Sequence, residues 1–396
     1  MKKAVVFTLG CKVNQCESQE IVNMLDVFGF RTATNLGYAD LYIINSCSVT
    51  NEADKKSRQA IARVKKFNEK AVVVVIGCAV EKGYETRDNV ELIGAKDKIE
   101  KLRKFVGNNF VRISNAGAAA LGCTNSKMRP MIKIQDGCNR FCSYCIVPYL
   151  RGRSVSRPVD EIINEVSQYK NIAKEIVLAG IDIAAYDDLI GLIKELGKNF
   201  KNDFRFRLGS LEQSIITKEF LIALKENNFC EHFHLSLQSG SDSVLKRMNR
   251  HYTAELFLEK VHMIREFFPL AAITTDIIAG FPGETEEEFE ATLNLINKAK
   301  FSNIHTFPFS ARKGTKAFEM DGQLSPQIKK ERANKIIEIA KQHRQDFLNK
   351  NIGQLQEVFV EENEGYTRNY IRLKIDGATT AAFANIKITK GDIIYE

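Results

Sequence analysis

The chain contains no tryptophan and no hydrophobic run long enough to cross a membrane. A membrane-spanning helix needs about 18 or more consecutive apolar residues, whereas the longest apolar run here, residues 71–76, has the length of one strand. The N-terminus carries two lysines and a short apolar stretch, but no small-residue cleavage site before Gly10-Cys11-Lys12. We therefore expect a buried first strand rather than a signal peptide, and a cytoplasmic protein that does not bind membranes.

A disulfide framework and long disordered tracts are not expected either. The composition, 44% hydrophobic and 27% charged, is typical of globular proteins. At 396 residues the chain is too long for one ordinary core, so we expect two or three domains. Nine cysteines, an odd number in a chain without an export signal, indicate metal or catalytic use instead of disulfide bonds.

Positive charge is concentrated in the middle of the chain. The formal net charge is +8. Residues 127–157 contain seven basic residues and one acidic residue, whereas residues 351–396 contain five basic and seven acidic residues. This distribution is compatible with RNA binding but does not demonstrate it.

The first hundred residues alternate between strand and helix patterns. Strand-like runs at 3–9, 41–45 and 71–77 are separated by helical patterns at 17–28 and 52–67. This order predicts an open parallel α/β sheet. Cys11, Cys47 and Cys78 follow the three strands, at the edge where such sheets bind ligands. We expect these three cysteines to converge, although small buried core cysteines are the alternative.

A second series of β/α units follows a stretch at 105–128 that lacks periodicity. Candidate strands lie at 131–135, 175–179, 204–208, 232–237, 271–278 and 303–307, with helical patterns such as 158–169, 188–196 and 284–298 between them. Six repeats predict a (β/α)6 partial TIM barrel, closed by a long helix at 325–349. Short runs at 356–361, 369–375, 381–388 and 392–395 predict a small antiparallel β domain. The expected domains are 1–110, a linker at 111–128, 129–350 and 351–396.

Cys138, Cys142 and Cys145 stand within eight residues of one another, directly after the first strand of the second series. Three thiolates on one loop bind three irons of a cubane cluster and leave the fourth iron open for a substrate. A zinc site without its fourth ligand and a chance grouping of core cysteines are the alternatives. No further cysteine or histidine lies nearby in the sequence, which disfavours zinc.

The Cys-x3-Cys-x2-Cys spacing resembles the signature of the radical-SAM superfamily, and Tyr144 before the third cysteine fits it too. The resemblance implies that Cys138, Cys142 and Cys145 hold a [4Fe–4S] cluster whose open iron binds S-adenosylmethionine (SAM). It further implies reductive cleavage of SAM to a 5′-deoxyadenosyl radical that abstracts hydrogen. In such enzymes the protein supplies positioning, since the cofactor carries the chemistry.

Other stretches similar to this family lie mostly at predicted strand ends, where a barrel gathers its active site. They contain the residues that we predict to contact SAM, namely Tyr144, Gly180, Ser210, Glu212, Gln238 and Gly280. The polar side chains suit the ribose or methionine of SAM, and Gly280 permits a close backbone approach. Hydrogen bonding at the core edge and an ordinary turn are the alternatives.

A narrower resemblance, to the methylthiotransferases, covers nearly the whole chain. It rests on G-C-K-V-N-Q at 10–15, N-S-C-S-V-T at 45–50 and G-C-A at 77–79. In that family the corresponding cysteines, here Cys11, Cys47 and Cys78, bind an auxiliary [4Fe–4S] cluster that carries the sulfur to be inserted. The resemblance thus implies two clusters, SAM and an electron donor such as flavodoxin or ferredoxin. Cys16 is a spare thiol or an alternative ligand, and Cys123 and Cys230 have no assigned role.

Three stretches are similar to the branch that modifies N6-threonylcarbamoyladenosine at position 37 of tRNA, the MtaB type: 12–15, 53–59 and 365–370. The last lies in a segment similar to a TRAM β-barrel, although this tail is short and slightly acidic. Isopentenyl-adenosine in tRNA and an aspartate of a ribosomal protein are the alternative substrates of this family. An RNA-binding iron–sulfur sensor without catalysis is the alternative from another class.

Two groups of residues are predicted to bind RNA. Arg151, Arg153 and Arg157 follow the cluster loop, where guanidinium groups pair with phosphates in a bidentate manner. In the tail, Tyr366 and Tyr370 beside Arg368 suit stacking on bases. A solvated basic face is the alternative for the arginines. We expect a monomer or a weak dimer.

Overall fold

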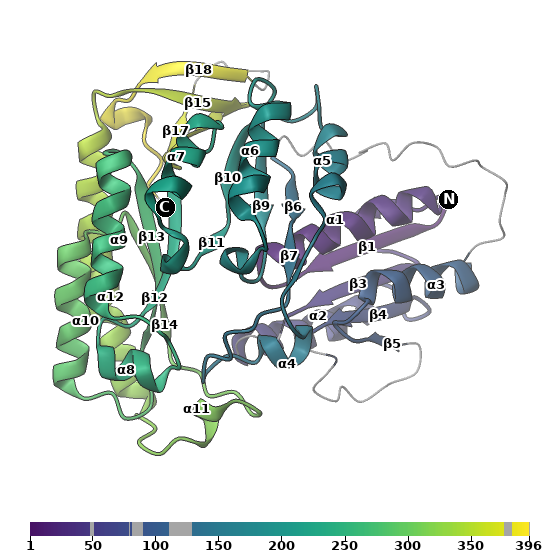
Figure 1. Cartoon of the computed structure of the whole chain (residues 1–396). Coiled ribbons are helices and arrows are strands. Elements are labelled where there is room, and N and C mark those ends of the chain that lie inside the picture. Colours follow the sequence, from purple (N-terminus) through teal and green to yellow (C-terminus); the bar gives the residue numbers. More distant parts are fainter. Residues whose placement is uncertain (48–50, 79, 81–89, 111–128, 376–381, 396) are drawn as a thin grey trace. The chain divides into compact units, whose positions relative to one another are not determined.

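The computed structural model describes residues 1–47, 51–78, 80, 90–110, 129–375 and 382–395 (Figure 1). Contacts within it divide the chain into two compact units. The first unit comprises residues 1–126, 136–139 and 145–153, and the second comprises residues 127–135, 140–144 and 154–396. No helix in the described ranges combines the length and the apolarity that crossing a bilayer requires.

The first unit contains a five-stranded parallel sheet in the order β2-β1-β3-β4-β5. Its strands are β1 (Lys3–Thr8), β2 (Arg31–Ala33), β3 (Leu41–Ser46), β4 (Val72–Gly77) and β5 (Val90–Ile93). The three central strands and their parallel pairing are confirmed. The edge strands β2 and β5 were not predicted, because three or four residues of mixed polarity leave too short a pattern to recognise.

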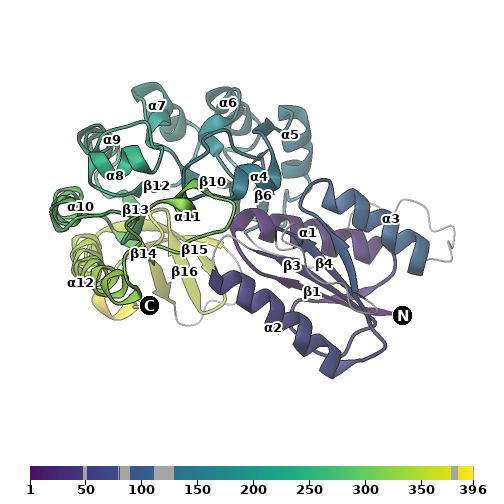
Figure 2. The ribbon, with the colours of Figure 1, turned by 90° about the horizontal axis from the view of Figure 1, so that it is seen from below.

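Helices cover both faces of this sheet, so its central strands are apolar throughout. α1 (Lys12–Val27) and α3 (Lys98–Phe110) pack on one face, and α2 (Asn51–Phe67) packs on the other (Figure 2). α1 begins at residue 12, earlier than the expected residue 17. Its first turn buries polar as well as apolar residues, such as Asn14 beside Val13. The apolar periodicity that predicts a helix is therefore missing from this turn.

The second unit contains the six strand positions of the predicted partial barrel, all parallel. They are β6 (Met131–Lys133), β9 (Glu175–Ala179), β10 with β11 (Arg205–Leu208, Ser210–Leu211), β12 (His232–Gln238), β13 (Ala272–Ala279) and β14 (Asn303–Pro308). β10 pairs with β9, and β11 pairs with β12, so Gly209 breaks one strand between two sheets. β7 (Gln135–Asp136) and β8 (Val155–Ser156) form a short separate ladder.

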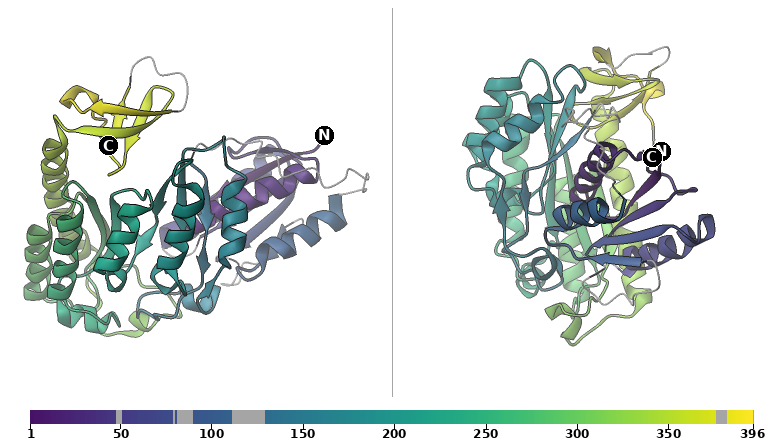
Figure 3. Two further views of the ribbon diagram at one scale, coloured as in Figure 1. Left: turned by 45° about the horizontal axis from the view of Figure 1, so that its top comes forward. Right: turned by 90° about the vertical axis from the view of Figure 1, so that its right-hand side faces the viewer.

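Helices stand side by side along the outer face of these strands (Figure 3). They are α5 (Val159–Ser167), α6 (Leu189–Phe200), α7 (Lys218–Glu226), α9 (Ala254–Phe267), α10 (Glu286–Ala299) and α12 (Pro326–Asn351). The short helices α8 (Asp242–Arg247) and α11 (Lys316–Glu319) lie at one end of the strands (Figure 1), and α4 (Val147–Arg151) belongs to the first unit. Several begin at side-chain caps. At α10, for example, Thr285 and Glu288 form a reciprocal capping box.

A small antiparallel β domain follows α12, as expected. Its sheet has the order β17-β16-β15-β18, formed by β15 (Leu355–Glu361), β16 (Glu364–Thr367), β17 (Arg372–Lys374) and β18 (Ala382–Lys387). The strand expected at 392–395 is wrong, because a 3-10 turn at Lys390–Asp392 leaves only an isolated bridge between Leu373 and Ile393. Leu348 of α12 joins the apolar core of this domain.

Candidate functional site

Cys11, Cys47 and Cys78 lie just past the ends of β1, β3 and β4, three neighbouring strands of the first unit. Cys47 and Cys78 are buried, and Cys11 is exposed at the start of α1. Gly10 makes a close approach possible: its φ is +106°, and a Cβ added to it would lie 2.6 Å from the Cβ of Cys47. The parallel sheet thus brings the three thiols to one edge.

The surroundings of these thiols suit ligands that act as thiolates. Burial raises the pKa of the Cys78 thiol, while the Arg151 and Lys98 cations beside it lower that pKa. Thiolate ligation of iron is favoured by such cations, because it places negative charge at the same edge. Within the described part of the chain, no three histidine, cysteine or acidic side chains are grouped as the ligands of a single metal ion would be.

Beneath the strand ends lies a buried network of charged groups that the sequence did not reveal. The Glu17 carboxylate in α1 lies 2.6 Å from Nζ of Lys98 and 3.0 Å from Nη1 of Arg151. The same Arg151 nitrogen lies 3.0 Å from the carboxylate of Asp136, two residues before Cys138. The network therefore ties the end of α4 and the start of the Cys138 loop to helices α1 and α3 within the first unit.

Two asparagines, one in the motif at 10–15 and one in the motif at 45–50, connect this network to the strand ends. Asn14 accepts a hydrogen bond from Nη2 of Arg151 at 2.7 Å and donates to the backbone oxygens of Leu9 and Ser46. Asn45 accepts from Nζ of Lys98 at 3.0 Å and donates to the backbone oxygen of Asn14. These side chains fix the segments that carry Cys11 and Cys47. Their presence in the motifs was the one sequence signal for the network.

The loop that begins the Cys138 motif has a backbone geometry that only glycine fits. Gly137 has a φ of +70°, and a Cβ there would lie 2.0 Å from the carbonyl oxygen of Arg153. This close approach sets the hydrogen bond from the Cys138 amide to the carbonyl oxygen of Gly152, at 3.1 Å. The loop is thereby held against the segment that follows α4.

In the second unit, Cys142 is buried beside Arg250, whose Nη1 lies 3.5 Å from the sulfur. Arg250 also pairs with Glu212 and lies 3.2 Å from the hydroxyl of Tyr252. Arg140 pairs with Asp182 at 2.7 Å and also faces Glu212. Burial raises the pKa of the Glu212 carboxyl, although Arg250 and Arg140 oppose the shift.

The other residues predicted to contact SAM lie at the carboxyl ends of barrel strands. Ser210 is exposed on β11, Gln238 ends β12 with a φ of +71°, and Gly180 and Gly280 follow β9 and β13. A Cβ added to Gly180 would lie 3.0 Å from Oε1 of Gln135. Their common location is the face where β/α barrels bind substrates. Tyr144 instead packs in an apolar cluster with Phe281 and Phe309, among others.

Comparisons with known proteins identify the family of the chain. The chain matches the radical SAM superfamily over residues 132–296 and an uncharacterized protein family, UPF0004, over residues 3–93. It is 34% identical to the threonylcarbamoyladenosine tRNA methylthiotransferase MtaB of Bacillus subtilis (strain 168), over 100% of this chain and 95% of the relative. The chain belongs to the radical-SAM tRNA methylthiotransferase family. It is therefore an enzyme that uses SAM and a [4Fe–4S] cluster on tRNA.

Other relatives and structures support the same family and fold. The enzyme is 39% identical to the MtaB of Chlamydia pneumoniae, over 90% of this chain and 86% of the relative. It is 34% identical to the tRNA-2-methylthio-N(6)-dimethylallyladenosine synthase of Thermodesulfovibrio yellowstonii, over the full length of both. The radical SAM methyltransferase TsrM of Kitasatospora setae shares its fold, with a TM-score of 0.55 and 13% identity, over 78% of this chain and 73% of that one.

Two of the three arginines predicted to bind RNA phosphates are used inside the enzyme. The Arg151 side chain is 3% exposed and takes part in the buried network, which contradicts a phosphate contact. Arg157 lies 2.7 Å from Glu165 and donates to the carbonyl oxygen of Lys133 at 2.6 Å, so its donors also face protein groups. Arg153 is exposed. The sequence showed the charge but not its partners.

The tail residues predicted to stack on bases hold the β domain against the barrel. Arg368 donates to the side chain of Asn228 and the carbonyl oxygen of Phe229, so these donors face protein groups of the barrel. The rings of Tyr366 and Tyr370 lie 5.1 Å apart. The Arg129 guanidinium covers Tyr366 at 4.0 Å. The guanidinium of Arg207 covers the ring of Tyr370, which is 41% exposed.

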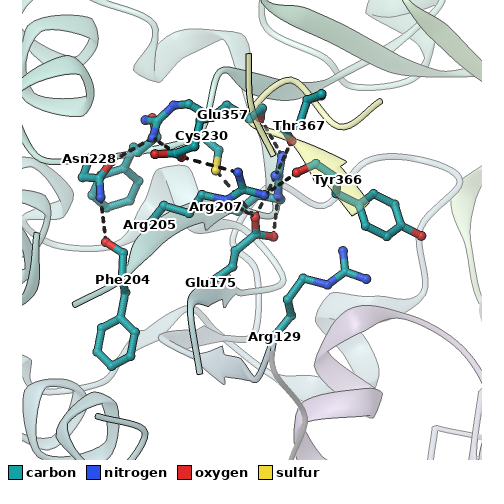
Figure 4. Close-up of polar contacts among 12 residues, drawn as sticks. Arg129, Glu175, Phe204, Arg205, Arg207, Asn228, Cys230, Glu357, Tyr366 and Thr367 are labelled. Carbon is teal, nitrogen blue, oxygen red and sulfur yellow. Dashed lines mark hydrogen bonds and ion pairs between the residues drawn. The ribbon is translucent and has the colours of Figure 1, made fainter. Parts of the chain in front are cut away.

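A buried glutamate organises this contact between the β domain and the barrel (Figure 4). Glu175 on β9 lies 2.7 Å from Nε of Arg205 and 2.9 Å from Nε of Arg207, both on β10. The two arginines also donate to backbone oxygens of Tyr366 and Arg368 in the β domain. Although burial opposes ionisation, the arginines hold the pKa of Glu175 well below its usual range.

The remaining cysteines have different surroundings. Cys230 is buried beside Glu175, with its sulfur 3.8 Å from the carboxylate, so it belongs to the contact between the β domain and the barrel. Cys16 is buried within α1. Cys123 lies outside the described residues. Neither Cys16 nor Cys230 is exposed in the manner of a redox-active thiol.

We predict that Gly137→Ala lowers the iron content of the Cys138 site without removing a ligand. The positive φ alone costs a non-glycine residue about 1–2 kcal/mol, and the added Cβ would clash with backbone. Iron per chain after anaerobic reconstitution measures the effect. Gly152→Ala is the matched control, since its φ is +80° but nothing lies within 4 Å of its added Cβ. Equal iron content in both variants would contradict the role of the close contact.

We predict that Glu175→Gln destabilises the second unit by about 3–5 kcal/mol, because two buried guanidinium groups lose their carboxylate. Chemical unfolding monitored by circular dichroism measures this loss. Glu364→Gln in the β domain is the control, since its ion pair with Arg372 is partly exposed to water and is worth about 0–1 kcal/mol. Similar unfolding midpoints for both variants would show that the buried pairs add little.

Proposed function

We propose that the enzyme transfers a methylthio group to C2 of N6-threonylcarbamoyladenosine at position 37 of tRNA, in the cytoplasm. The proposal includes two [4Fe–4S] clusters and two molecules of SAM for each product. Four relatives that carry the threonylcarbamoyladenosine name are 33–39% identical to the chain over 90–100% of its length. The observation that carries the proposal is the position of Cys11, Cys47 and Cys78 at adjacent strand ends, beside buried cations.

The cysteines have distinct roles in this proposal. Cys138, Cys142 and Cys145 hold the cluster that binds SAM, and Cys11, Cys47 and Cys78 hold an auxiliary cluster. When bound, the first cluster with SAM supplies hydrogen abstraction, and the second supplies sulfur. We assign residues 1–110 to the auxiliary site, 129–350 to the radical-SAM domain and 351–396 to a TRAM-like domain, with a linker at 111–128.

The side chains around these cysteines prepare the sites for charged ligands. Arg250 lies against the sulfur of Cys142 and supports a thiolate there, while its pairing with Glu212 fixes the guanidinium in place. Ser210, Gln238, Gly180 and Gly280 line the strand ends where SAM would lie, and Tyr144 packs against the apolar cluster that contains Phe281 and Phe309. Burial of the Cys142 side chain excludes water from its sulfur.

The exposure of the residues predicted to bind RNA indicates which of their side chains can contact tRNA. Arg153 and Tyr370 keep exposed side chains among the residues predicted to bind RNA. The adenosine lies in the anticodon loop, so no duplex must open, although the base must be splayed out. A flavodoxin or ferredoxin would supply electrons, and the enzyme would act as a monomer or weak dimer.

Dimethylallyladenosine in tRNA is the second candidate substrate, because relatives with that name are as similar as some MtaB proteins, at 33–35% identity. The two side groups differ chemically: the threonylcarbamoyl group carries a carboxylate, whereas the dimethylallyl group is apolar. A polar site rejects an apolar analogue strongly, since its buried polar groups then stay unpaired.

The substrate test incubates the reconstituted enzyme with SAM, a reductant and tRNA carrying one or the other modification. We expect methylthio product only on threonylcarbamoyl-adenosine, detected by mass spectrometry of the digested nucleosides. Product only on the dimethylallyl tRNA would assign the second substrate. Product on neither tRNA, but on ribosomal protein, would overturn RNA as the substrate.

The second test counts clusters by iron and sulfide analysis. We expect about eight irons per chain for two cubane clusters. Replacing Cys138, Cys142 and Cys145 together with alanine leaves about four. Cys142→Ala alone abolishes SAM cleavage, because the cluster that binds SAM then loses one of its three thiolate ligands. Four irons in the intact enzyme, unchanged when Cys11, Cys47 and Cys78 are replaced, would remove the basis for sulfur insertion.

A further inference from the structure

The network beside Cys11, Cys47 and Cys78 holds two cations and two carboxylates, but only one carboxylate is buried with the cations. Lys98 and Arg151 are 2% and 3% exposed in their side chains, and Glu17, the carboxylate between them, is 3% exposed. The second carboxylate, Asp136, lies 3.0 Å from Arg151 but is 32% exposed and therefore partly screened by water. Water thus weakens one of the two negative charges that face the buried cations.

Both cations act on the Cys78 thiol. Burial raises the pKa of that thiol, and the charges of Arg151 and Lys98 oppose this shift. A Cβ added to Gly77, the residue before Cys78, would lie 3.5 Å from Nζ of Lys98. Lys98 therefore stands immediately behind the last residue of β4, at the edge where three cysteines gather.

Buried charge is costly unless opposite charge lies close to it, so a fold that retains buried cations usually places anions nearby. Glu17 stabilises the Lys98 cation in this way, at a distance of 2.6 Å. A further negative group at the strand ends would stabilise the same cation by Coulomb attraction. Three thiolates around a [4Fe–4S] core carry such a negative charge.

We propose that Lys98 and Arg151 are positioning residues that hold the auxiliary cluster electrostatically and raise its reduction potential, while Glu17 lowers that potential. The inference rests on the proposed function, which supplies the auxiliary cluster. A cation beside a cluster favours its reduced, more negative state, and a carboxylate favours the oxidised state. Removing Lys98 and removing the charge of Glu17 therefore have opposite effects on the same group.

The test uses the full chain with Cys138, Cys142 and Cys145 replaced by alanine, so that a single cluster remains. The midpoint potential of that cluster is measured by redox titration with electron paramagnetic resonance. We expect Lys98→Met to lower the midpoint, Glu17→Gln to raise it, and the double variant to return it toward the parent value. Arg151→Met lowers the midpoint, and Arg151→Lys restores part of it because the charge remains.

Lys101→Met is the matched control, since Lys101 is exposed on the same helix, α3, and solvent screens its charge. It leaves the midpoint and the iron content unchanged. A second readout is the rate at which a chelator removes iron, which we expect to rise several-fold in Lys98→Met and not in Lys101→Met. The rate of iron removal can also be measured in variants whose cluster is too unstable for a redox titration.

The outcomes separate the two proposals. If the parent variant binds no iron, the proposed second cluster fails, and the electrostatic inference fails with it. If the parent binds about four irons but Lys98→Met and Glu17→Gln shift the midpoint in the same direction, or not at all, only the electrostatic inference is overturned. A shared direction would mean that the network stabilises the fold around Cys78 without acting on the cluster by charge.

Discussion

Parallel strands all end at the same edge of their sheet, and both candidate sites of this enzyme depend on that constraint. In the first unit it places Cys11, Cys47 and Cys78 at adjacent strand ends, although dozens of residues separate them along the chain. In the second unit it gathers the residues predicted to contact SAM at the ends of β9, β11, β12 and β13. A parallel sheet requires crossover helices, and these helices bury the apolar strands from both sides.

The buried ion-pair networks of the enzyme have two different roles. At Glu175 it joins two elements of one unit, because guanidinium groups of β10 reach backbone oxygens of the β domain. At Glu17 the same chemistry borders a group of thiols, and the two buried cations act on the thiol of Cys78. Buried ion pairs add little net stability when complete, yet they are costly to break. Both networks therefore specify where segments lie more than they strengthen the fold.

Local sequence patterns predicted the central strands and the long helices closely. The predicted strand at 175–179 coincides with β9. Its residues are apolar except for Glu175, and a run of only five residues is too short for a typical helix. The patterns failed where structure depends on distant partners. The edge strand β2 has three residues and exists through its pairing with β1, and the segment at 392–395 finds only one bridging partner. Arg151 was predicted to face RNA, but its side chain is buried beside Glu17, because charge alone does not show burial.

The sequence by itself determined the chemistry of the enzyme: two cysteine triads, their spacing and the motifs around them identify the family and the kind of cofactor. These are properties of neighbouring residues, which the order of the chain fixes directly. The tertiary structure decided which charges serve those cysteines. Glu17, Lys98 and Arg151 come from three helices, and only the packing of those helices around the strand ends makes them one network. Pairing between residues more than a hundred positions apart leaves no periodic trace in a single sequence.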